Sequence, residues 1–410
     1  MINEFRSYTS DWHGLSKVLL AATVLVGSAL ASASEFTNAQ PEGGALAPDR
    51  FADHFDLASA TRLEQAMERG ARHVRELGLS NLPPPGIARA AVSGLIWPLA
   101  PAPGEGVNWH GISNFVDLNP AFPNQVLDYN CGARTYDNNS GYNHRGTDFF
   151  LWPFPWTVMD AGTISAVAAA PGTIIARIDG NFDRECTGAN DTPNYLFVQH
   201  SDGTVAWYLH LKNGSLTPKG IGASVLAGEY LGLVASSGAS TGPHLHFELR
   251  ASSAGNAEVL DPFQGSCQNS ASSWAQQRPY YDSTLIRLAT HNLAPAFPNC
   301  PATTDTPNFK TAFLPGEQIR FAAYYRDQRR GQVSNFRILR PDGSVFEQFD
   351  FDSGGVAGSP DHYAASYWVW TYTLPANAPQ GYWSWVSSYQ GRTLSHKFAV
   401  GDPLFTDRFE

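Results

Sequence analysis

Two histidines stand one residue apart in GPHLHFELR, residues 242–250. Successive side chains of a β-strand point to opposite faces, so His244, His246 and Glu248 would share a polar face, with leucine and phenylalanine on the other. An antiparallel strand with its apolar face in a core and two exposed histidines is the simplest interpretation. Imidazole also binds metals and transfers protons near neutral pH, so the pair predicts a reactive site if partner residues lie elsewhere in the chain.

A histidine and an aspartate lie four residues apart in NHRGTDFF, residues 143–150. On a strand, His144, Gly146 and Asp148 would lie on one face, and the missing side chain at Gly146 leaves room between the two polar groups. Imidazole nitrogen and carboxylate oxygen both bind zinc, and a catalytic zinc keeps three protein ligands with a fourth position open. The motif therefore predicts part of a metal site, and a surface pair is the alternative for the motif alone.

A further histidine lies in WYLHLK, residues 207–212. Strand alternation places His210 opposite Trp207, Leu209 and Leu211, which would face a core. Taken alone, His210 is expected to be an exposed strand residue. It becomes informative only together with the other two stretches.

The three stretches follow one another in the order H-x-x-x-D, Y-x-H-L and S-x-G-x-S-T-G-P-H-L-H-F-E, which closely resembles the lysostaphin/LytM-type zinc metallopeptidases. In that family the His and Asp of the first motif and the second His of H-x-H bind zinc, which implies His144, Asp148 and His246 as ligands here. The remaining histidines, His210 and His244, are implied as catalytic residues. The resemblance also implies a β-barrel-like antiparallel sheet with Zn²⁺ in a groove floored by strands.

The resemblance covers residues 140–252 and implies a function. The family's substrates are peptide bonds in bacterial cell-wall cross-bridges and stems, often containing glycine. The leading hypothesis is a secreted zinc-dependent metalloendopeptidase that hydrolyses peptidoglycan. A second hypothesis is an extracellular protease of glycine-rich proteins such as elastin. A third is a non-catalytic cell-wall-binding or regulatory module, which some relatives became by losing zinc ligands, whereas all five site residues are present here.

Two features beside the motifs have open roles. Glu248 would either support a histidine from behind or lie on the surface. The aromatic and proline-rich stretch FFLWPFPWTVMDAG follows Asp148, where the family usually turns quickly into its next strand. Its aromatic residues would either line the rim of the groove or form a buried plug: Trp152, Phe154 and Trp156.

Short strand-like runs separated by turn residues fill residues 95–280, which we expect to form an all-β zinc metallopeptidase domain with antiparallel strands. A second series of alternating strands over residues 305–403 predicts an immunoglobulin-like β-sandwich that folds independently. Its tryptophans are expected in the sandwich core, with an aromatic binding face as the alternative: Trp368, Trp370, Trp383 and Trp385.

Apolar residues at helical spacing over residues 57–77 predict an amphipathic helix, with Thr61 and Glu64 in capping-box register. Residues 34–94 as a whole are expected to be a prosegment or an accessory helical region packed on the main domain. Residues 1–33 combine basic residues, a short apolar run and a small-residue stretch, which predicts a signal peptide, with an uncleaved anchor as the alternative.

Export would place the mature protein in a secreted or periplasmic, oxidising location. The four cysteines contain no C-x-x-C pair, so we expect two disulfides between sequence neighbours, Cys131 with Cys186 and Cys267 with Cys300. The net charge of −10 argues against nucleic acid as a partner. We expect a monomer without stable membrane association after signal cleavage, whose partner is a peptidoglycan peptide or a glycine-rich protein substrate.

Overall fold

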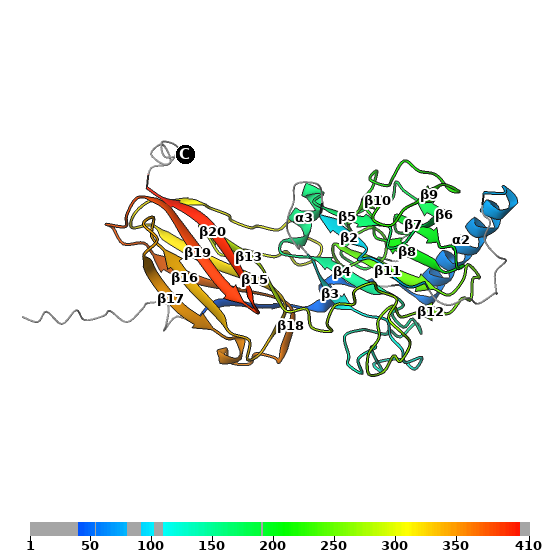
Figure 1. Ribbon diagram of the computed structural model, residues 1–410, viewed down its shortest axis with the longest axis horizontal. Helices are drawn as coiled ribbons and strands as arrows, with labels where there is room; N and C mark the ends of the chain where they lie inside the picture. Colours follow the sequence, from blue (N-terminus) through cyan, green and yellow to red (C-terminus); the bar gives the residue numbers. More distant parts are fainter. Residues whose placement is uncertain (1–39, 54, 80–91, 102–109, 190–191, 402–410) are drawn as a thin grey trace, which may run out of the picture.

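The computed structural model describes residues 40–53, 55–79, 92–101, 110–189 and 192–401. Strands dominate these residues, and the long helix α2 (Leu57–Glu76) lies near the N-terminus, so the predicted all-β core with an N-terminal helical segment is confirmed. Figure 1 shows two strand-rich regions along the long axis of the molecule, one mostly cyan to green and one yellow to red. The predicted signal peptide, residues 1–33, lies outside the described residues.

The largest sheet carries the three histidine motifs. Its spatial order is β3 (His110–Asn114), β4 (Thr147–Leu151), β11 (His244–Arg250), β8 (Val205–Leu209), β7 (Tyr195–Gln199), β6 (Gly172–Ile178) and β9 (Ser224–Val225), with β12 (Val259–Leu260) beside β11. All pairs are antiparallel. Because β11 lies between β4 and β8, strands that are distant in sequence bring the three motifs side by side.

Both faces of this sheet are covered. On one face, a smaller sheet contributes to a common apolar core; its strands are β10 (Tyr230–Leu233), β5 (Ile164–Val167) and β2 (Leu99–Pro101). On the other face lie Phe55 and the apolar side of α2. Every residue of β11 is therefore buried, and the interpretation of this strand as one with two exposed histidines is wrong.

Helix α2 packs against β6 and β7 through its apolar stripe of Leu63, Met67 and Val74. Its N-terminal cap is Asp56, whose carboxylate accepts a hydrogen bond from the Ser59 amide at 2.7 Å. The predicted capping-box role of Thr61 is wrong, because its hydroxyl lies inside the helix and donates to the Leu57 carbonyl. None of the helices in the described part of the chain combines the length and apolar character of a membrane span.

The second region contains two sheets that share one apolar core. One sheet has the order β1 (Glu42–Leu46), β18 (His362–Thr373), β15 (Gln318–Arg329) and β13 (Thr284–His291). The other has the order β14 (Ala312–Phe313), β20 (Arg392–Val400), β19 (Gly381–Tyr389), β16 (Ser334–Leu339) and β17 (Val345–Phe351). Short 3₁₀ turns are η1 (Pro48–Phe51) and η2 (Ser353–Gly355).

The four tryptophans of this region are 0–2% exposed and belong to the shared core, which confirms the core interpretation. An immunoglobulin-like topology stays a prediction. Two strands from outside residues 305–403, β1 and β13, complete one of the sheets. A cut at residue 305 would separate β13 from its partner β15, so this sheet is not built by residues 305–403 alone.

The aromatic stretch after Asp148 leads into helix α3 (Pro155–Ala161) and joins the two regions. Trp152 and Phe154 are buried, and their rings stack on Phe297 with centroid distances of 5.3 and 5.1 Å. Tyr324 of β15 contacts both rings. The plug interpretation is therefore confirmed for Trp152 and Phe154, whereas Trp156, which is also buried, lines a cavity together with Thr241 and Gly242.

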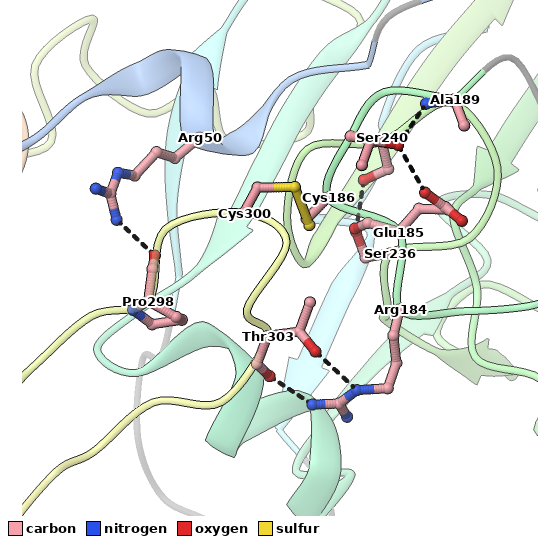
Figure 2. The surroundings of a disulfide bond; sticks show 11 residues. Arg50, Arg184, Glu185, Cys186, Ala189, Ser236, Ser240, Pro298, Cys300 and Thr303 are labelled. Carbon is pink, nitrogen blue, oxygen red and sulfur yellow. Dashed lines mark hydrogen bonds between the residues drawn. A yellow bond between two sulfur atoms is a disulfide. The ribbon is translucent and has the colours of Figure 1, made fainter.

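Both disulfides differ from the predicted pairs. The structure joins Cys131 to Cys267 and Cys186 to Cys300. Residues that are close in an antiparallel sheet come from distant parts of the chain, so sequence neighbours were the wrong guide to the pairing. The Cys186–Cys300 bond, shown in Figure 2, attaches the loop after β6 to the segment that follows β13.

Candidate metal centre and active site

Four buried side chains converge on one point: Asp53, His144, Asp148 and His246. Each offers a ligand atom within 4.8 Å of the other three. Asp148 lies at the centre, with one carboxylate oxygen 3.1 Å from His144 Nε2 and the other 3.0 Å from His246 Nδ1. The three residues implied as zinc ligands therefore lie together, and a second carboxylate joins them.

The sheet register sets this geometry. Asp148 on β4 and His246 on β11 are directly opposite each other in the antiparallel pair. His144 lies just before β4, and Gly146 passes so close to the neighbouring ring that a Cβ there would lie 2.6 Å from His246 Nε2. Glycine at this position is therefore required for the ring to fit, in agreement with the room expected from the sequence.

Hydrogen bonds at the far side of each ring set which nitrogen faces the cluster. His144 Nδ1–H donates to the Phe115 carbonyl at 2.7 Å, which leaves Nε2 for the cluster. His246 Nε2–H donates to Glu248 at 3.3 Å, which leaves Nδ1. Glu248 is 2% exposed and is held in turn by Arg250, so its supporting role is confirmed and its surface role is wrong.

His210 and His244 lie beside the cluster with ring centroids 4.5 Å apart, and both are fully buried. Their Nδ1–H groups donate to the carbonyls of Ser237 and Gly242 at 2.6 and 2.7 Å. Neither Nε2 makes a hydrogen bond within the described part of the chain. The interpretation of His210 as an exposed residue is wrong; two buried imidazole lone pairs instead adjoin the metal-ligand cluster.

Burial and neighbouring charges separate the protonation states of these groups. Burial, together with the adjacent His244, holds the pKa of His210 well below 6.5, and burial also lowers the pKa of His244. Burial opposes ionisation of Asp148, but the neighbouring histidines, His144 above all, together outweigh it and hold the pKa of Asp148 well below 3.8. Two neutral imidazoles thus lie next to an ionised carboxylate.

Asp53 is the member of the cluster that the sequence analysis missed. Its Oδ1 lies 3.5 Å from His144 Nε2, and its Oδ2 lies 3.4 Å from His246 Nδ1 and accepts from the Tyr142 hydroxyl at 3.0 Å. Burial raises the pKa of Asp53 above 3.8. No spacing motif links it to the histidines, and an acidic residue in a predicted prosegment is too common to single out.

The residues around Asp53 lie across the site in an extended conformation. The Ala52 amide lies 3.0 Å from the Thr241 hydroxyl oxygen and donates to it, and the Ala52 carbonyl accepts from the Thr241 amide at 3.0 Å. The Phe51 carbonyl accepts from the Ser113 hydroxyl at 2.8 Å, and the Phe55 ring stacks on His210 with centroids 5.7 Å apart. The N-terminal segment therefore covers the candidate site much as a bound peptide would.

The donor set fits zinc. Two imidazole nitrogens and carboxylate oxygens are ligands that zinc prefers, and each histidine has a hydrogen-bond acceptor behind it. Asn114 donates to Asp148 at 3.1 Å, and the Tyr136 ring stacks on His144 at 4.7 Å, so these groups are also held in place. The second carboxylate of the cluster comes from the N-terminal segment rather than from the sheet.

Comparison with known proteins matches part of the chain to a peptidase family. The profile described as peptidase family M23 matches residues 143–262. The DD-carboxypeptidase/endopeptidase Mpg of Neisseria meningitidis serogroup B is 33% identical over 97 residues, which are 23% of this chain and 22% of the relative. The glycyl-glycine endopeptidase ALE-1 of Staphylococcus capitis is 32% identical over 124 residues, 30% of this chain and 29% of the relative.

Among solved structures, the catalytic domain of lysostaphin from Staphylococcus simulans is similar at 27% identity, covering 30% of this chain and 78% of that one, with a TM-score of 0.22. The chain spans less than a third of the length of the two curated relatives described above. The matched residues include all five site residues implied by the motifs: His144, Asp148, His210, His244 and His246. Residues 143–262 of this chain are a domain of peptidase family M23.

Proposed function

We propose that the chain is a zinc metalloendopeptidase that hydrolyses peptide bonds in the cross-bridges or stems of peptidoglycan. The observation that carries the proposal is the pair of buried imidazoles, His210 and His244, whose Nε2 atoms make no hydrogen bond within the described residues and lie beside the cluster of metal-ligand atoms. A purely structural cluster would have no use for two such nitrogens, because an unsatisfied buried polar group destabilises the fold.

In this proposal His144 Nε2, Asp148 and His246 Nδ1 hold the zinc ion. Zinc supplies Lewis acidity that polarises the scissile carbonyl and makes the attacking water more acidic. His210 and His244 are neutral, with Nδ1–H fixed on backbone carbonyls, so one of the two Nε2 atoms would accept the single proton that the attacking water gives up. The protonated ring then donates to the leaving amine nitrogen. Glu248 keeps the His246 ring oriented.

We also propose that residues 34–94 are a prosegment that keeps the site closed until it is removed. Asp53 takes the place of an additional ligand, and Phe55 covers His210. The alternative of a permanent accessory helical region predicts full activity with the segment attached. Limited proteolysis of the full chain, followed by mass spectrometry and an activity assay on each product, separates the two.

The test of the main function is release of soluble muropeptides from purified sacculi by the processed, zinc-loaded protein. A glycine-rich protein such as elastin is the second substrate class. Cleavage of elastin without release of muropeptides from sacculi would favour that hypothesis. No hydrolysis of either, with stoichiometric zinc bound, would favour the non-catalytic binding or regulatory module. We also propose that the protein is secreted and that it is a monomer. The two disulfides support secretion, because disulfides persist in oxidising compartments.

A further inference from the structure

We propose that the edge of β18 covered by β1 is a strand-addition site for an extended, glycine-containing segment of the substrate. In this inference, which rests on the proposed peptidase function, β1 occupies the place of that segment. An edge strand presents unpaired amides and carbonyls, and an added peptide strand gains main-chain hydrogen bonds there. β1 pairs antiparallel with β18 from Glu42 opposite Val369 to Leu46 opposite Ala365.

The sequence of β1 shows what this edge selects. β1 reads EGGAL, and its two glycines have φ values of 128° and 142°, which side-chain-bearing residues rarely adopt. A Cβ on Gly43 would overlap the Tyr367 carbonyl oxygen, whereas a Cβ on Gly44 would meet no atom within 4 Å. The edge of β18 therefore has no room for a side chain at the place of Gly43, whereas at the place of Gly44 only the backbone conformation disfavours one.

The same segment connects this edge to the candidate active site. Leu46, at the end of β1, and Phe51 belong to one buried apolar cluster with Phe150 of β4 and Ala365 of β18. Phe51 stacks on Phe150 with centroids 4.7 Å apart, and Asp53 follows in the metal-ligand cluster. One continuous stretch of chain thus runs from the β18 edge to the site.

A cavity of about 800 Å³ lies along this path. Its lining includes Leu46 and Asp53 of the N-terminal segment, Tyr136 beside the metal ligands, and His362 and Tyr363 at the start of β18. A substrate that followed the course of the N-terminal segment would have room here for side chains or a branched peptide. The two regions of the molecule then form one extended binding surface.

The contacts that hold the segment in place include some outside β1. Arg50 donates to the Pro298 carbonyl at 3.0 Å, as Figure 2 shows, and also contacts Asn299. These partners lie on the segment that the Cys186–Cys300 disulfide attaches to the peptidase domain. Loss of β1 would leave them unaffected, so the β18 edge can be opened by changes in β1 alone.

The experiment compares Gly43→Ala with its matched control Gly44→Ala in the full chain. Hydrogen exchange of β1 and β18 amides reports whether the edge opens. We expect exchange to rise about tenfold more in Gly43→Ala than in Gly44→Ala, because the first adds a steric overlap to the backbone strain that both variants share. Binding is then measured by fluorescence anisotropy with a labelled peptide of residues 40–51, which ends before Asp53 and cannot reach the metal ligands. An unrelated probe of repeated Gly-Gly-Ala-Leu units competes with it.

We expect the Gly43→Ala chain to bind both probes, with alanine at the peptide's Gly43 position weakening binding about tenfold more than alanine at its Gly44 position. Equal binding of the two alanine peptides, failure of the unrelated probe to compete, or unchanged exchange in Gly43→Ala would overturn the proposal. If Gly43→Ala does not fold, Leu46→Ala opens the same strand. Binding needs neither zinc nor hydrolysis, so an inactive protein that still binds would refute the peptidase function and not this site.

Discussion

Residues 140–252 and the N-terminal segment from Glu42 to Asp53 both contribute to the metal-ligand cluster, but their sequences mark these contributions differently. The first stretch holds its chemistry in short motifs on strands that pair with one another, and Asp148 and His246 lie opposite each other in that pairing. The second stretch has no motif, pairs with a strand more than three hundred positions away, and ends in the same cluster. Long-range strand pairing thus assembles both parts, but short motifs mark the reactive residues and no motif marks the segment that covers them.

The largest effect is expected from replacing the two histidines of β11, His244 and His246, which belong to the stretch that the motifs mark. His246→Ala removes a ligand atom, so zinc content and peptidase activity should both fall to background. His244→Ala should keep zinc and lose on the order of 10²–10⁴-fold in kcat. Zinc content measured beside turnover decides it. His210→Ala should behave like His244→Ala. If His244→Ala loses zinc and His246→Ala retains it, the assignment of ligand and catalytic residue is reversed.

Replacing Asp53 tests the role of the N-terminal segment, which no motif marks. Asp53→Ala in the unprocessed chain removes the second carboxylate of the cluster, so activity before processing should rise by about tenfold or more, while the processed enzyme is unchanged. Asp56→Ala is the matched control, since it removes the cap of α2 in the same segment and costs about 1 kcal/mol of stability without freeing the site. Equal activation by both variants would mean that loosening of the segment, and not loss of Asp53, is responsible.

The Cys186–Cys300 disulfide links the two regions across 114 positions of sequence. Replacing both cysteines with serine should reduce the free energy of unfolding by about 2–5 kcal/mol. Thermal unfolding measures this loss. Peptide mapping without reduction checks the pairing itself, and finding Cys131 joined to Cys186 would contradict the structure.

The smallest effect concerns His291, a buried residue of β13 near the junction. Burial lowers its pKa to about 4, and it is neutral, donating to the Pro307 carbonyl and accepting from the Tyr324 hydroxyl. The unfolded chain protonates it near pH 6.5, so this stabilisation is complete above pH 6.5 and is lost as pH falls toward 4, by about 2 kcal/mol at pH 5. His291→Gln should show a smaller drop in Tm between pH 7 and pH 5 than the unchanged chain; an equal drop would assign the acid sensitivity elsewhere.

The sequence was sufficient for the all-β fold and the N-terminal helix, because strand alternation and helical spacing are local properties. That His144, Asp148 and His246 lie together was implied by the family resemblance. The sequence did not show which polar side chains would be buried. His210 and Glu248 were expected on a surface in one interpretation, and only the packing of Phe55 and α2 over the sheet makes them interior residues. The cysteine pairing and the position of Asp53 depend on which distant segments meet, and no spacing rule contains that information.

The pairing of β1 with β18 has a consequence for how the chain folds. Glu42 lies opposite Val369, so one of the earliest described segments can complete its sheet only after one of the last strands has formed. Loop closure over such a distance is slow, and long-range pairing dominates folding time. The N-terminal segment that carries β1 and Asp53 therefore packs over the active site late in folding. Until β1 has paired with β18, an incompletely folded chain has an active site that this segment does not cover.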